Sequence, residues 1–71
     1  MTLGEFIETF TPSVNMFMLD IHNANNNKVL KTVEVYSKWD VPYTGCKVVK
    51  WSMASGYHIW LNVWIEVEED G

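Results

Sequence analysis

Arginine is absent from the sequence, and cysteine, proline and glycine are scarce. All five positive charges are lysines, so the chain lacks the forked, bidentate grip on phosphate that a guanidinium offers. Nine acidic residues bring the net charge to -4, whereas duplex nucleic acid requires clustered positive charge. The composition therefore disfavours binding to duplex nucleic acid through its phosphate backbone, and we expect no duplex nucleic acid among the partners.

The single cysteine, Cys46, excludes an intramolecular disulfide, and with two histidines it makes a poor zinc set. The sequence contains no glycine-rich phosphate loop, no G-x-S-x-G and no C-x-x-C motif. A thiol nucleophile would need His22 or His58, but we expect Cys46 at the far end of a hairpin from His58. A weak metal site of Asp20, His22 and His58 would require the first and last strands to be neighbours. We predict a non-enzyme with no catalytic residues, metal or cofactor.

Long apolar runs are also missing, and no stretch reaches the length of a membrane helix. Residues 1–5 lack the basic start of a signal peptide, so we expect a soluble, cytoplasmic protein. The 71 residues predict a single domain, 1–71, and a chain of this size buries only about 60% of the surface exposed when unfolded. Without a disulfide or metal, oligomerisation is the remaining way to enlarge a thin core.

The longest alternating run is Tyr57–Val67, YHIWLNVWIEV. Its odd positions are all apolar or aromatic, and its even positions are His58, Trp60, Asn62, Trp64 and Glu66. A period of two places these sets on opposite faces of a β-strand. One face is core, while the other is too aromatic for an ordinary wet surface.

The rest of the chain predicts one helix and three further strands. Thr2 and Glu5 fit a capping box ahead of apolar residues at helical spacing, which predicts a helix over 3–10 that Pro12 stops. Alternation predicts strands over residues 13–22, 28–38 and 46–53. The predicted fold class is α+β, with one short N-terminal helix packed on a four-stranded antiparallel meander.

Two hairpins follow from this order. Pairing Ile21 with Val29 would place the apolar sets of the first two strands on one face. In the last hairpin, a three-residue turn at 54–56 would pair Trp51 with Ile59, whereas a two-residue turn would move Trp51 to the second face. We prefer the first register because it buries more apolar area. Its second face would pair Ser52 with His58, Lys50 with Trp60, Val48 with Asn62 and Cys46 with Trp64.

A short helix covers only one sheet face, so the other face would expose a large apolar patch. The patch would comprise Met16, Met18, Tyr36, Val48, Trp60 and Trp64. All of these except Val48 form our predicted interface, since aromatic residues and methionine are enriched at protein interfaces. A homo-oligomer seam, another protein and a flat aromatic ligand all remain possible occupants.

A ligand site is the alternative use of the same aromatics. The connection at 39–45, WDVPYTG, is irregular and carries two aromatic residues, and such loops often hold binding groups. Indoles stack on nucleobases, while lysines neutralise phosphate. The predicted ligand-binding residues are Trp39, Tyr43, Lys47, Lys50 and Trp60. A structural role for Trp39, covering the end of the core, is the competing interpretation.

Four segments resemble short reading frames common in phages and prophages of gut Firmicutes: MTLGEFIETF at the start, Ser37–Trp39, YTGCKVV at 43–49 and NVWIEV at 62–67. The resemblance implies a small, non-enzymatic phage protein in the bacterial cytoplasm. Phage proteins of this sort often block bacterial immunity, by plugging a CRISPR effector or by sequestering an immune nucleotide signal.

Three functional hypotheses follow. The first is an anti-defence homo-oligomer that captures a nucleotide second messenger between its subunits. The second is an anti-CRISPR-type inhibitor that binds a host defence protein through the second sheet face or the acidic tail, Glu66–Asp70. The third is a structural or accessory phage protein.

Overall fold

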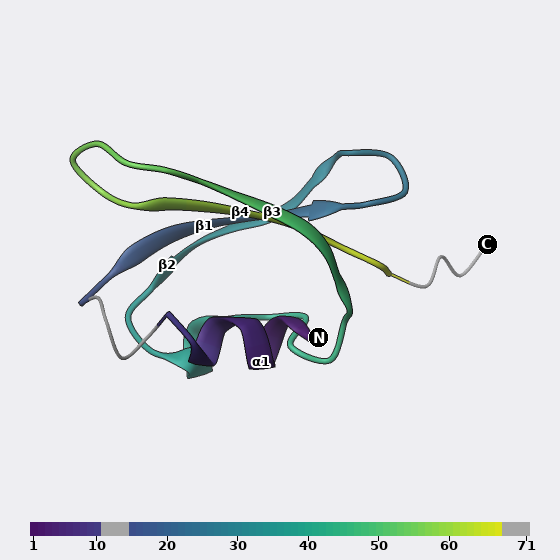
Figure 1. The fold of residues 1–71 in the computed structure, drawn as a ribbon, viewed down its shortest axis with the longest axis horizontal. Coiled ribbons are helices and arrows are strands. Elements are labelled where there is room, and N and C mark those ends of the chain that lie inside the picture. The colour runs from purple at the N-terminus through teal and green to yellow at the C-terminus, as the bar shows by residue number, and fades with distance from the viewer. Residues whose placement is uncertain (11–14, 68–71) are drawn as a thin grey trace.

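The computed structural model describes residues 1–10 and 15–67. Its elements are helix α1 (Leu3–Glu8), strands β1 (Phe17–Asn23) and β2 (Val29–Val35), the 3-10 turn η1 (Lys38–Asp40), and strands β3 (Val48–Ala54) and β4 (Trp60–Ile65). The strands form one sheet, and α1 lies on one side of it (Figure 1). The predicted α+β class, with one short helix and a four-stranded sheet, is confirmed.

The sheet is mixed, so the predicted antiparallel meander is wrong. The strand order is β2-β1-β4-β3, and β1 and β4 pair in parallel at the centre of the sheet. Each hairpin is antiparallel, as expected, and their two turns lie at opposite ends of the sheet (Figure 1). The central strands also bury the most side chains, because a central strand is flanked by neighbours on both edges.

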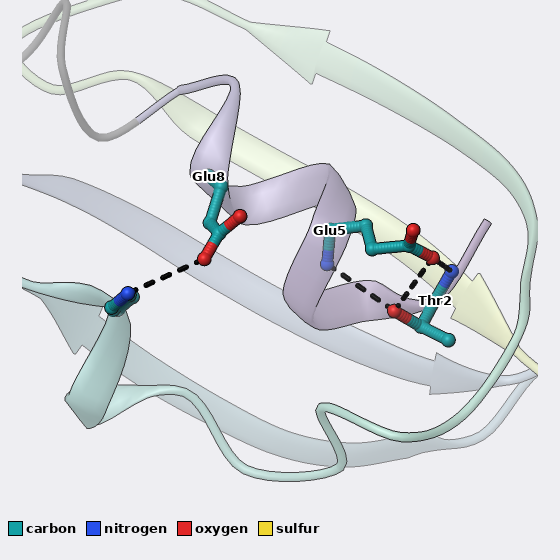
Figure 2. Close-up of polar contacts among 4 residues, drawn as sticks. Thr2, Glu5 and Glu8 are labelled. Carbon is teal, nitrogen blue, oxygen red and sulfur yellow. Dashed lines mark hydrogen bonds and ion pairs between the residues drawn. The ribbon is translucent and has the colours of Figure 1, made fainter.

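Helix α1 begins at the predicted capping box. The Glu5 N–H donates to Thr2 Oγ1 at 3.3 Å, and the Thr2 N–H donates to Glu5 Oε1 at 2.9 Å (Figure 2). The helix ends at Glu8, short of the predicted Phe10, because the next two N–H groups bond to carbonyls three residues back. The predicted stop at Pro12 and the start of the predicted first strand fall in residues 11–14, outside the described residues.

The N-terminal segment is bonded to the loop that precedes β3. The Gly4 N–H donates to the Thr44 carbonyl at 2.9 Å, and the Val48 N–H donates to the Met1 carbonyl at 2.9 Å. A Cβ added at Gly4 would stand 3.2 Å from both Cβ and O of Thr44. A glycine therefore permits this close approach, although it weakens the helix.

The core lies between α1 and the side of the sheet that faces it. Every second residue of β4 is fully buried there, while Trp60 on the other side is 38% exposed. This confirms the two-face interpretation of the last strand. The buried hydrophobic residues are Leu3, Phe6, Ile7, Phe17, Leu19, Ile21, Val35, Val41, Leu61, Val63 and Ile65.

The β1–β2 hairpin does not have the predicted register. Ile21 pairs with Lys31, two residues beyond the expected Val29. The ladder also shifts between Ile21 and His22, and this irregularity reverses the sides of the residues that begin β2. Val29 is consequently 53% exposed, and Leu30 packs against the core in its place.

The β3–β4 hairpin matches neither of the turns considered. Trp51 pairs with Val63, so residues 55–59 form a longer loop between the strands. Trp51 still lies on the helix side, as the preferred register required, because the shift is by an even number of residues. Tyr57, expected in the core, stands in this loop and is fully exposed.

The start of β3 also departs from the prediction. A register shift between Val48 and Lys50 turns Val48 to the helix side, opposite Ile65. Val48 and Cys46 both pack against the core. Their predicted places on the second face, beside Asn62 and Trp64, are therefore wrong.

Candidate functional site

Among the described residues, no element covers the side of the sheet opposite α1 (Figure 1). We call this side the open face. Its side chains stand in three rows that run across the strands, since directly paired residues share a face. The rows are Glu34, Met18, Trp60 and Ala54; Thr32, Asp20, Asn62 and Ser52; and Val29, His22, Trp64 and Lys50.

One row is built around the indole of Trp64. The His22 ring stacks on it at a centroid distance of 4.4 Å and an interplanar angle of 12°. The Lys50 ammonium lies 4.7 Å from the centroid of the same indole, a cation–π geometry. Because β4 lies between β1 and β3, the imidazole and the ammonium approach Trp64 from neighbouring strands on either side. Positive charge is thus held at one end of the open face.

The middle row is polar. Thr32 Oγ1 donates to Asp20 Oδ1 at 2.6 Å, and His22 Nε2 lies 3.2 Å from Asn62 Oδ1, a bond in which the imidazole N–H donates. Asp20 and Asn62 are direct partners in the parallel β1–β4 ladder. The second Asp20 oxygen and the Asn62 amide N–H groups are bonded to no other described side chain. A carboxylate acceptor and an amide donor therefore stand side by side between the two tryptophans.

The predicted interface residues largely gather on the open face. Met18 is the direct partner of Trp60, and Trp64 occupies the row at the other end. Tyr36 directly follows β2, and its hydroxyl donates to Glu34 at 3.5 Å. Met16 directly precedes β1 and is half-buried.

The predicted ligand-binding residues do not form one site. Lys50 and Trp60 share the open face but stand in different rows. Trp39 lies in η1, 84% exposed, and Tyr43 lies in the following loop with a positive φ of 59°. Lys47 forms a bridge with Thr2. The structure thus divides this set between the open face and the loops around the helix.

A cavity of about 310 Å³ lies beside α1, where Trp39 stands. Its lining is Gly4, Glu5, Ile7, Glu8, Lys38, Trp39, Val41 and Thr44. Its lysine is already paired, since Lys38 Nζ lies 3.3 Å from Glu8 Oε1 (Figure 2). Hydrogen bonds from the backbone and side chain of Thr2 lower the pKa of Glu5, which keeps this carboxylate charged. Such a cavity disfavours phosphate.

The residues considered for a thiol nucleophile or a metal site do not all lie together. β1 and β4 are neighbours, as a site of Asp20, His22 and His58 would require, but His58 stands in the loop before β4. Within residues 1–10 and 15–67, no three His, Cys, Asp or Glu side chains are grouped to hold a metal ion. Cys46 packs against the core, whereas His22 stands on the open face and His58 in the loop before β4.

Sequence reasoning missed the pairs that define the open face. Neighbours such as His22 and Trp64 are far apart in the chain, and only the parallel β1–β4 pairing joins them. The alternation of β1 did place Met18 and Asp20 on one side, but nothing in that pattern named the strand next to it. What the sequence did not indicate was which strands are neighbours in the sheet.

No protein-family model matches the chain, and comparisons with curated proteins and with solved structures found no match. In the part of the chain that the structure describes, no helix has the length and apolarity needed to cross a membrane.

Proposed function

We propose that the protein is a non-enzymatic binding protein that captures a nucleotide on its open face, and that this stoichiometric capture counters bacterial antiphage immunity. The observation that carries the proposal is the arrangement of two tryptophans about a polar row, with a lysine and a histidine at one end. The phage context comes from the sequence resemblance alone.

The base and the phosphate of a nucleotide each have matching groups on this face. The indole of Trp60, 38% exposed, offers a stacking surface to a base. Asp20 and Asn62 offer an acceptor and a donor to the polar edge of that base. Lys50, whose ammonium lies over the Trp64 indole, offers positive charge to phosphate. The open face suits a phosphate better than the cavity beside α1, which Glu5 and Glu8 line.

The test is a titration of the purified protein with a panel of linear and cyclic nucleotides, followed by calorimetry and tryptophan fluorescence. We expect saturable binding that Trp60→Ala weakens by about 10- to 100-fold, because stacking contributes about 1–3 kcal/mol per base. Trp39→Ala is the matched control, since this indole is 84% exposed and stands outside the open face. Failure of every nucleotide to bind would overturn the proposal.

A second candidate is an anti-CRISPR-type inhibitor that uses the open face to bind a host defence protein. It is favoured by the adjacent Met18 and Trp60, residue types that are enriched in interface cores. The acidic tail is the other proposed contact, and its residues 68–70 lie outside the described residues. Binding to a purified effector that weakens with salt would implicate the tail, whereas loss of binding in Trp60→Ala would implicate the open face.

A further inference from the structure

The two edge strands of the sheet, β2 and β3, differ in how well they resist pairing with another strand. β2 carries Lys31 and Glu34, and charges on an edge strand discourage such pairing. β3 carries a single charge, Lys50, and its Trp51 and Met53 are 50% and 52% exposed. β3 is therefore the edge strand that is more open to pairing with another strand.

The direction of the backbone groups shows what the β3 edge offers. The carbonyls of Ile59 and Ile65 accept bonds from the β1 side at 2.8 and 2.9 Å, so odd-numbered residues of β4 turn toward β1. The even-numbered residues then turn toward β3 and meet positions 50, 52 and 54. Trp51 and Met53 must accordingly direct their N–H and C=O groups away from β4, to the outer edge.

The N-terminal segment occupies only the beginning of this edge. The Leu3 N–H donates to the Cys46 carbonyl at 2.8 Å, and the Val48 N–H donates to the Met1 carbonyl at 2.9 Å. The edge beyond this segment runs over residues 50–54, and its midpoint is Ser52.

We propose that two copies of the chain associate through this edge, with residues 50–54 paired antiparallel about a two-fold axis at Ser52. Trp51 would then lie opposite Met53 of the partner subunit, so that the groups directed outward bond reciprocally. One side of the Trp51 indole already packs on Phe6, at 5.4 Å between centroids, and its exposed part would cover the partner's Met53. The same register sets Lys50 opposite Ala54 of the partner subunit, which keeps the two ammonium groups apart.

This association would join the two sheets into one and place both open faces side by side. The inference does not depend on the proposed ligand, because the seam uses the outward backbone groups of β3 and the helix-side side chains of Trp51 and Met53, whereas the stacking and polar groups proposed for the ligand stand on β1 and β4. A dimer without nucleotide binding, and nucleotide binding by a monomer, are both measurable outcomes.

Light scattering over a concentration series tests the association. We expect the wild type to approach twice the 8.3 kDa chain mass and to dissociate on dilution. Met53→Lys, which places two ammonium groups at the seam, should remain a monomer with an unchanged circular dichroism spectrum. Val29→Lys is the matched control, because Val29 is equally exposed, at 53%, on the other edge strand. A monomeric wild type, or a dimer that Met53→Lys does not dissociate, would overturn the proposal.

Disulfide trapping tests the register in a Cys46→Ser background. Ser52→Cys should cross-link two copies on oxidation, because residues that face each other at a two-fold axis lie within the roughly 4.4–6.8 Å that a disulfide spans. Lys50→Cys should not cross-link, because residue 50 of one subunit and residue 50 of the other would lie about 14 Å apart along the paired strands. The reverse pattern would contradict pairing about Ser52.

Discussion

The two faces of the sheet are made by the same strands but hold different kinds of side chain. On the helix side, β4 presents Leu61, Val63 and Ile65, all fully buried. On the open face it presents Trp60, Asn62 and Trp64, which hydrogen-bond, stack and remain partly exposed. Burial of apolar side chains on the helix side stabilises the fold. The open face instead carries polar groups that the core does not need for its stability. Stability and binding are therefore separable by substitution.

The largest effect is expected on the helix side. Leu61→Ala should lower the free energy of unfolding by about 2–5 kcal/mol, because it leaves a cavity among fully buried side chains. Asn62→Ala, one residue along on the open face, should cost about 1 kcal/mol through the lost bond with His22. Urea denaturation measures both. Equal losses for the two variants would contradict the division between the faces.

The next effect concerns the helix that covers one face. Thr2→Ala removes the capping hydroxyl and should cost about 1 kcal/mol of stability. Thr32→Ala removes a hydroxyl from the open face, and at an exposed position the change should stay within about 0.5 kcal/mol. Thermal melts followed by circular dichroism compare this matched pair. A larger cost for Thr32→Ala would mean that its bond to Asp20 contributes to the fold itself.

A smaller effect is expected from the contact between Lys50 and Trp64. A double-mutant cycle with Lys50→Met and Trp64→Leu should give a coupling energy of about 0.5–1 kcal/mol, as for exposed cation–π pairs. The cycle compares unfolding free energies at low and high salt. A coupling near zero would show that the lysine is free to bind a ligand without losing a structural contact.

The smallest effect is a dependence on pH at the helix cap. Hydrogen bonds from Thr2 lower the pKa of Glu5 below the ordinary 4.5, so the charged form stabilises the folded state. This contribution is present above the unfolded-state pKa and is lost as pH falls through the lower, folded-state value. The Glu5→Gln variant has no carboxyl group to titrate at this position. The difference in the free energy of unfolding between wild type and variant should therefore shrink in acid. Nucleotide binding at the open face should not follow the same profile.

Local patterns predicted the elements and which sides are buried, because these depend on neighbouring residues. The capping box at Thr2 and Glu5 was readable since its partners are three residues apart. The buried side of Tyr57–Val67 was readable over the residues that became β4, but not at Tyr57, which the longer loop leaves exposed.

Partner strands and exact registers could not be read in the same way. The bulges beside His22 and Val48 reverse the side of the sheet that the neighbouring residues face. No glycine or proline at either position indicates a bulge in the sequence. The central pairing of Met18 with Trp60 depends on how the two hairpins dock, and both strands would have kept their alternation in a meander. The open face was therefore foreseen as a surface, but the arrangement of its groups was not.

The parallel pair at the centre of the sheet has a consequence for synthesis on the ribosome. β4 is made after the other strands, yet it fills the position between β1 and β3. Until residues 60–65 leave the exit tunnel, β1 and β3 each lack a neighbour, and the first hairpin has no partner to complete the sheet. Pairings between distant segments form slowly, so we expect the sheet to be completed only after residues 60–65 have emerged.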